Sequence, residues 1–166
     1  AVQLLVAFGH RLNVALAQQA IRQHDEIGAA RELLSQLDLA GWIVTGDAKF
    51  TQRGLAEQIV AAGGDYVMIV KDNQPTLRTD IATLYSELAI VADTVTETAS
   101  CTCHGYRIER RCLIASSALR DYCDWPGLEQ VFRRLALRGA VTGGFCGESA
   151  RTSLGIHPSR HFRFTG

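Results

Sequence analysis

Two polar segments each follow a strand-like apolar run, and both could bind a charged ligand. Asp47 comes just after the run 42–45 and a glycine. The segment 71–74, Lys-Asp-Asn-Gln, follows the apolar run 65–70. Ligand sites in open α/β sheets form at the carboxyl ends of strands. A carboxylate at Asp47 could therefore hold Mg²⁺ together with water and phosphate oxygens.

Each segment also has a purely structural interpretation. Asp47 precedes a helix-like stretch and could cap it by accepting hydrogen bonds from its first amides. Lys71 could contact a phosphate, and Asn73 and Gln74 could hydrogen-bond to a nucleic-acid backbone or base. Asp and Asn close before a proline are, however, also ordinary turn residues. The local sequence leaves both interpretations of each segment open.

A third polar cluster, His-Gly-Tyr-Arg-Ile-Glu-Arg-Arg, lies at 104–111. A strand here could face DNA phosphates, which makes His104, Arg107 and Arg110 candidate DNA-contacting residues. Glu109 could then pair with an arginine or lie near a metal ion. The alternative is a solvated strand face with an Arg–Glu cross-strand pair, and the sequence does not decide the role of Glu109.

The apolar spacing predicts an α/β domain around these segments. The expected elements are strands at 2–8, 14–20, 42–45 and 65–70 and helices at about 25–37, 51–62 and 75–88. The first two strands should form a hairpin. Asp25 should cap the first helix, Ala30 and Leu33 should lie on its buried side, and Gly63 should end the second helix. The runs 42–45 and 65–70 are continuously apolar, which is typical of buried strands. Strands that alternate with helices predict parallel crossovers and a layered α/β fold.

The second part of the chain gives weaker signals. Alternation predicts a strand near 106–112, and the segment 125–139 fits a turn followed by either a strand or a helix. After residue 138 the sequence is rich in Gly and Ser and has no clear period, so we expect a loosely ordered tail. The predicted organisation is one domain over residues 1–135 and a divergent tail over 136–166.

Composition excludes several classes of protein. The 166 residues are 47% hydrophobic, typical of a folded globular chain, and no apolar run approaches the roughly 20 residues needed to span a bilayer. The five cysteines lack zinc-site spacing, which favours free thiols in a reducing cytosol.

The charges are unevenly distributed along the chain. Residues 1–100 carry 7 basic and 12 acidic groups, whereas residues 101–166 carry 10 basic and 5 acidic groups. The basic second part could meet nucleic-acid phosphates or could simply be solvated.

Several of these segments occur together in one known family. In order, the blocks DEI, IVTGDA, GGDY and KDNQPTL within residues 16–77 resemble the bacterial H-repeat-associated transposases of the DDE insertion-sequence group. The blocks HGYRIERR and WPGLEQVFR resemble two further blocks of that family, in the same order. The resemblance covers about residues 2–135.

The resemblance implies a fold, a chemistry and a partner. The fold is a ribonuclease-H-like α/β core, a mixed sheet flanked by helices. Two aspartates and a glutamate would bind two divalent ions, Mg²⁺ or Mn²⁺. One ion activates water or a DNA 3′-hydroxyl, and the other stabilises the leaving oxygen. Asp47 aligns with the second aspartate, so it would be both a metal ligand and a catalytic residue, and the partner would be DNA, as transposon ends and target.

Two of the three carboxylates have no match in this sequence. The family's first aspartate lies on a strand before 2–8, and its glutamate lies in a helix beyond the WPGLEQVF block. We therefore expect a catalytic-domain fragment, incomplete at both ends, with weak or no metal binding and no DNA cleavage alone. A non-catalytic DNA-binding remnant is the main alternative, and an unrelated small α/β enzyme is a third. Strand 2–8 would have an exposed edge, so we also expect self-association.

Overall fold

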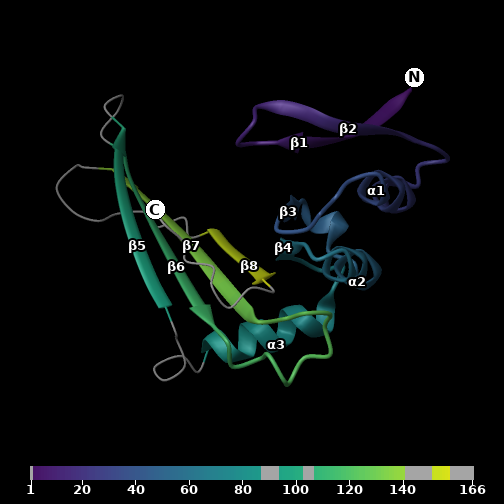
Figure 1. Ribbon diagram of the computed structural model, residues 1–166. Coiled ribbons are helices and arrows are strands. Elements are labelled where there is room, and N and C mark those ends of the chain that lie inside the picture. Colours follow the sequence, from purple (N-terminus) through teal and green to yellow (C-terminus); the bar gives the residue numbers. More distant parts are fainter. Residues whose placement is uncertain (1, 87–93, 103–106, 141–150, 158–166) are drawn as a thin grey trace.

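A computed structural model of the chain describes residues 2–86, 94–102, 107–140 and 151–157 (Figure 1). In chain order the elements are β1 (Gln3–Gly9), β2 (Val14–Ile21), α1 (Glu26–Ser35), β3 (Ile43–Gly46), the short 3₁₀ turn η1 (Ala48–Phe50), α2 (Arg53–Ala61), β4 (Asp65–Val70), α3 (Pro75–Ser86), β5 (Thr94–Thr102), β6 (Arg107–Ser116), β7 (Gln130–Ala140) and β8 (Arg151–His157). The predicted α/β class is confirmed.

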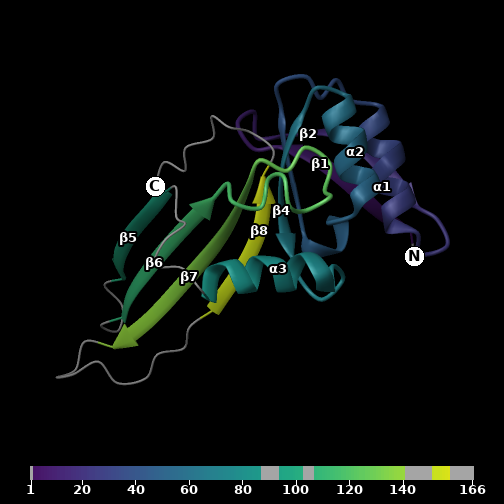
Figure 2. The ribbon, with the colours of Figure 1, turned by 90° about the horizontal axis from the view of Figure 1, so that it is seen from below.

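The described strands form two sheets. β1 and β2 make a separate antiparallel hairpin, as predicted, and the other six strands form one sheet in the order β3-β4-β8-β7-β6-β5. This larger sheet is mixed, because β3 and β4 run parallel while its other neighbours run antiparallel. Figure 2 shows α3 lying across β7 and β8, with α1 and α2 side by side at the other end of the molecule.

Helix α1 joins the hairpin to the larger sheet. Its predicted N-cap is confirmed, because an Asp25 carboxylate oxygen accepts a hydrogen bond from the Gly28 amide at 2.8 Å. The apolar side of the helix is also as predicted, with Ala30 and Leu33 buried in the core. On the opposite surface, the Gln19 side-chain amide of β2 donates to the Glu32 carboxylate, which fastens the helix to the hairpin.

The two strands predicted to be buried differ in their surroundings. In β4 the alternate side chains Tyr66, Met68 and Val70 are buried in the core, whereas the side chains between them are half-buried, so one face of the strand is fully buried and not both. β3 instead forms an edge of the sheet, and Trp42 and Ile43 are each 44% exposed. The prediction that 42–45 is a buried strand is therefore wrong. An apolar run this short does not reveal whether a strand has one neighbour or two.

The expectation of a loosely ordered tail is wrong for residues 136–140 and 151–157. The first group continues β7, so the predicted boundary at 135 falls inside a strand, and the second group forms β8 between β4 and β7. A Cβ atom at Gly155 would lie 2.1 Å from Phe132 Cζ and 2.7 Å from the Met68 carbonyl oxygen. The Gly-rich composition that suggested disorder thus includes a glycine that close strand packing requires.

The structure also bears on three smaller predictions. The segment 125–139 is a turn followed by strand β7, and the strand predicted at 106–112 is confirmed as part of β6. Cys123 is a free thiol, as expected. Among the described residues, the helices are all too short or too polar to cross a membrane.

Replacing Gly155 with alanine should strongly destabilise the protein. The added methyl group must displace the Phe132 ring and the β4 backbone, so we expect the free energy of unfolding to fall by about 3 kcal/mol. Urea unfolding followed by circular dichroism measures this loss.

Gly54→Ala is the matched control for that measurement. Gly54 lies in α2, and its new Cβ would meet only the movable end of the Arg31 side chain. Alanine favours a helix over glycine by up to about 1 kcal/mol, so this variant should be as stable as the native chain or more so. Equal effects of the two substitutions would contradict the packing of β8 described above.

Candidate functional site

The candidate site lies where the parallel strands β3 and β4 end. Their register pairs Gly46 with Met68, so the chain leaves both strands at the same rim of the sheet. Asp47 follows β3 directly, and Lys71 follows β4. The Lys71 Nζ atom lies 3.8 Å from Asp47 Oδ1, and the two side chains are 63% and 75% exposed. The sequence placed both residues at strand ends, and the structure brings them together as an ion pair.

Asp47 also caps the turn that follows it. Its Oδ1 atom accepts a hydrogen bond from the Ala48 amide at 2.7 Å, at the start of η1. The structural interpretation of Asp47 is therefore confirmed for η1 but not for helix α2, whose N-cap is Gln52. The cap and the ion pair both involve Oδ1. Within the described part of the chain, no hydrogen bond reaches Oδ2. One oxygen orients the group, and the other faces solvent, where a ligand could reach it.

The side chains of Asn73 and Gln74 hold the two strand-end loops together. Asn73 Nδ2 donates to the Ala48 carbonyl oxygen at 2.8 Å and to the Thr51 carbonyl oxygen at 3.2 Å. Gln74 Nε2 donates to the same Thr51 oxygen at 3.0 Å. These amide N–H groups thus position the loop that carries Asp47 against the loop that carries Lys71. Contact of either side chain with DNA stays a prediction.

Thr51 is also central to this arrangement, although its local sequence does not mark it as a site residue. Its side chain is fully buried, and Oγ1 donates to the Ile69 carbonyl oxygen at 2.6 Å. This bond links the segment after η1 to the end of β4. The only sequence signal is a threonine just before a helix, a position where threonine usually serves as a cap. Its burial depends on β4 and cannot be read locally.

Lys71 is the cation that contacts Asp47. Lys49, the other lysine near this carboxylate in the sequence, is paired with a different residue. Lys49 Nζ lies 2.8 Å from the Glu26 carboxylate at the start of α1. An exposed ion pair such as Asp47–Lys71 contributes at most about 1 kcal/mol. A ligand with its own charge could therefore displace Lys71 from Asp47 at little cost.

The described residues alone do not make a divalent-metal site. Among them there is no group of three or more His, Cys, Asp or Glu side chains placed to share a metal ion. Asp47 supplies one carboxylate, and the ammonium of Lys71 occupies the space beside it. Mg²⁺ is usually held by one or two carboxylates with waters and substrate phosphates. Tight binding would need oxygen ligands beyond those that the described residues bring together.

The other candidate residues lie far from Asp47 or outside the described residues. His104 is outside them. Arg107, Glu109 and Arg110 are in β6, whose backbone is described without these side chains. β4, β8 and β7 separate β6 from β3, so the two strands are roughly 19 Å apart at the usual spacing of neighbouring strands. The structure therefore does not place Arg107 or Arg110 beside Asp47.

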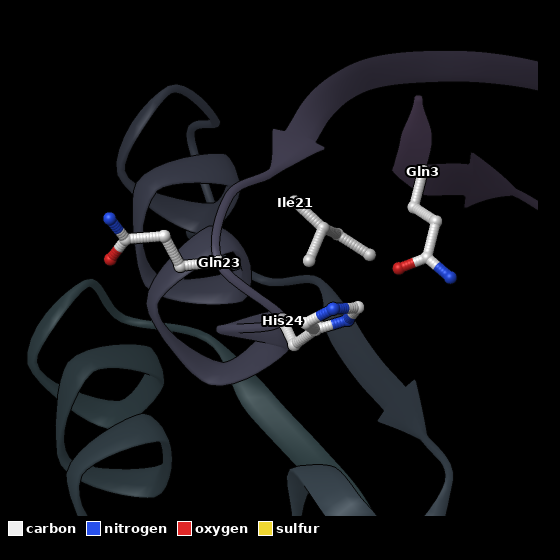
Figure 3. Close-up of a pocket in the computed structure, with 4 residues that line it drawn as sticks. All are labelled: Gln3, Ile21, Gln23 and His24. Atoms are coloured by element: carbon white, nitrogen blue, oxygen red, sulfur yellow. The ribbon is translucent and has the colours of Figure 1, made fainter. Parts of the chain in front are cut away.

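A surface hollow of about 390 Å³ lies at the base of the hairpin, lined by Gln3, Ile21, Gln23 and His24 (Figure 3). Figure 3 shows the His24 ring directed toward Gln3 and Ile21, whereas the end of Gln23 points away from them. Both Gln23 and His24 have positive φ angles, 52° and 61°. The lining includes no carboxylate, so this hollow does not offer the oxygen ligands expected of a Mg²⁺ site.

Comparison with known proteins supports the resemblance seen in the sequence. The chain is 34% identical over 149 residues to an uncharacterized protein in the dhlA 3′ region of Xanthobacter autotrophicus, covering 86% of this chain and 50% of that protein. It is 37% identical over 78 residues to the "H repeat-associated putative transposase YbfD" of Escherichia coli, covering 46% of this chain and 31% of that protein. It is 30% identical over 151 residues to the "Putative transposase YncI" of Escherichia coli, covering 83% and 37%.

The chain thus resembles H-repeat-associated transposases, as its motifs predicted, and it spans half or less of the length of these relatives. No protein-family model matches the sequence, and no solved structure matches the chain.

Asn73→Ala should loosen the candidate site. The substitution removes the donor to two carbonyl oxygens, so we expect a loss of about 1–2 kcal/mol in the free energy of unfolding. Amide hydrogen exchange in residues 47–51 should also become faster. Thermal unfolding and exchange measured by NMR test the two effects.

Asp72→Ala serves as the control in the same loop. Asp72 makes an exposed ion pair with Arg78 at 3.1 Å, and its loss should cost no more than about 0.5 kcal/mol. The proposed role of Asn73 fails if the two variants unfold and exchange alike.

Proposed function

We propose that this chain is part of a transposase, and that Asp47 is one of the carboxylates of its DNA-cleaving centre. The observation that carries the proposal is an exposed carboxylate at the rim between two parallel strands, in a chain that resembles proteins named as transposases.

The order of the elements supports a ribonuclease-H-like core. An antiparallel hairpin is followed by α1, then by β3 and β4, which run parallel and are joined through α2. β3 and β4 belong to a mixed sheet with helices packed against it, which fits the core that the resemblance implies, whereas the hairpin forms a sheet of its own. In such a core the carboxyl end of β3 is a natural position for a ligand-binding aspartate.

A divalent ion, Mg²⁺ or Mn²⁺, would supply the Lewis acid for cleavage of the phosphodiester bond. Toward that ion the described residues contribute the Asp47 carboxylate. The cap from the Ala48 amide holds this carboxylate in one orientation, and Asn73 holds the loop that carries it. Further oxygen ligands are needed, and for this reason we propose that the chain alone binds metal weakly and does not cut DNA.

DNA is the proposed partner. Lys71, which is paired with Asp47, is the described cation best placed to contact a phosphate near that carboxylate. The Lys71 ammonium is exposed, so it could leave Asp47 and neutralise a phosphate once a metal ion takes its place. Arg107 and Arg110 are further proposed contacts to DNA phosphates because they are positively charged. They lie on β6, so they would contact the DNA at a different part of the surface from Asp47.

A non-catalytic DNA-binding role is the second candidate. The specific observation in its favour is that the described residues include no group of three or more potential metal ligands, and that Asp47 is paired with a lysine. In that role Lys71 would contribute to a salt-dependent affinity for DNA, and Asp47 would serve only as a cap.

Mn²⁺ binding distinguishes the two roles of Asp47. We expect Mn²⁺ to broaden the backbone amide signals of residues 47–51 in an NMR titration with an affinity in the millimolar range, and Asp47→Asn should abolish the effect. Lys71→Gln should strengthen binding by up to about five-fold, because it removes the competing ammonium.

Asp38→Asn is the matched control for the titration. Asp38 is also exposed and accepts a hydrogen bond from a nearby amide, that of Ala40 at 3.1 Å, but it does not follow a strand. Its replacement should leave the broadening unchanged. If the Lys71→Gln chain shows no broadening that depends on Asp47, the metal-binding role is wrong.

A nicking assay tests whether the chain is active alone. With Mg²⁺ or Mn²⁺ and a supercoiled plasmid, we expect the native chain to cut no faster than Asp47→Asn. Nicking that requires Asp47 would overturn the claim of inactivity, since the chain would then carry a sufficient ligand set.

DNA binding measured by fluorescence anisotropy should weaken uniformly in Lys71→Ala, with a smaller salt dependence.

A further inference from the structure

One face of the β1–β2 hairpin is apolar and open to solvent. Leu4, Val6 and Phe8 alternate along β1, so their side chains lie on the same face, and they are 53%, 46% and 47% exposed. We name these three residues the hairpin face. The alternate residues Leu5 and Ala7 are half-buried on the other face, where α1 packs. Among the described residues, no helix covers the hairpin face as α1 covers the opposite one.

Exposed apolar side chains are concentrated in this part of the molecule. Eleven large hydrophobic residues are exposed in the described part of the chain, and seven of them belong to residues 2–16. Besides the hairpin face they include Leu12 at the turn and Val14 and Leu16 on β2. Figure 1 shows the hairpin as a separate layer beyond the six-stranded sheet. Single exposed apolar side chains are common, but a contiguous patch usually marks an interaction surface.

The charge of the hairpin restricts what could bind there. Residues 2–21 include one formally charged side chain, that of Arg11 in the turn. A nucleic acid would need several cations, which the strands of the hairpin do not supply. A second identical surface meets the chemical requirement, because two uncharged apolar faces approach each other without repulsion.

The edge of the hairpin lacks the usual protection against pairing. β1 is hydrogen-bonded to β2 alone among the described strands. Exposed edge strands commonly carry lysine, other charged residues or proline, which discourage association. β1 has none of these, with the sequence QLLVAFG. Its backbone and its side chains are thus both suited to contact another molecule.

We propose that the hairpin face is a self-association surface, on which a second copy of this chain packs its own Leu4, Val6 and Phe8. A twofold axis near Val6 would bring the same residues of both copies together. Leu4, Val6 and Phe8 expose on the order of 300 Å² per copy, so the roughly 800 Å² per partner of a standard interface would also take in neighbouring side chains of β2 and a polar rim.

Molar mass in solution tests the proposal. Size-exclusion chromatography with light scattering should give twice the 18.1 kDa chain mass at micromolar to hundred-micromolar concentration. Val6→Lys and Leu4→Lys should each give the monomer mass, because apposed lysines repel and are costly to bury. Tyr122→Lys, which also replaces an exposed large side chain but lies outside the hairpin, should leave the dimer intact.

Mixing two charged variants tests for a second copy directly. Val6→Lys and Val6→Glu chains should each be monomeric, and an equimolar mixture should recover the dimer mass, because the two copies then carry opposite charges at the axis. Circular dichroism and urea unfolding verify that each variant is folded. The proposal is overturned by a monomeric native chain, by a dimer that survives Val6→Lys, or by a mixture that stays monomeric.

Discussion

The position of the candidate site depends on the parallel pairing of β3 with β4. Parallel strands end at the same rim, so the residues that follow them meet without any long side-chain reach. An antiparallel pair would have placed Lys71 at the opposite end of β3 from Asp47. β4 can fix this rim because it is paired on both sides, with β3 and β8, and because its alternate side chains fill the core. Backbone hydrogen bonds, rather than the weak Asp47–Lys71 ion pair, therefore hold the site in place.

The two interpretations of Asp47 are compatible once its oxygens are considered separately. The cap occupies Oδ1 and fixes the direction of the carboxylate, while the exposed side chain leaves Oδ2 to solvent. A ligand-binding carboxylate gains from being held in this way, because its orientation is set before the ligand arrives. The structural role thus supports the proposed one. What limits the site is the number of ligands, since one carboxylate beside an ammonium does not balance the charge of a divalent ion.

The sequence predicted features that depend on local spacing, and it missed features that depend on distant partners. The Asp25 cap, the buried side of α1 and the end of α2 before Gly63 follow from helical periodicity and from residue types at helix ends. The edge position of β3 could not be predicted, because an apolar run is the same whether one neighbour pairs with it or two. β8 was missed because its Gly155 has meaning only against Phe132, and Thr51 was missed because its bond partner lies 18 residues away.

Helix α1 couples the hairpin to the rim that carries Asp47. On one side it contacts β1 and β2, and Gln19 of the hairpin is hydrogen-bonded to Glu32. At its start, Glu26 pairs with Lys49, two residues after Asp47, and along its length the Arg31 carbonyl oxygen accepts a hydrogen bond from Gln58 of α2 at 3.0 Å. A twofold axis through the hairpin face would therefore relate not only two hairpins but also two Asp47 rims, each held to its own hairpin by the same helix. Disrupting the hairpin contact would separate the two rims without altering either one.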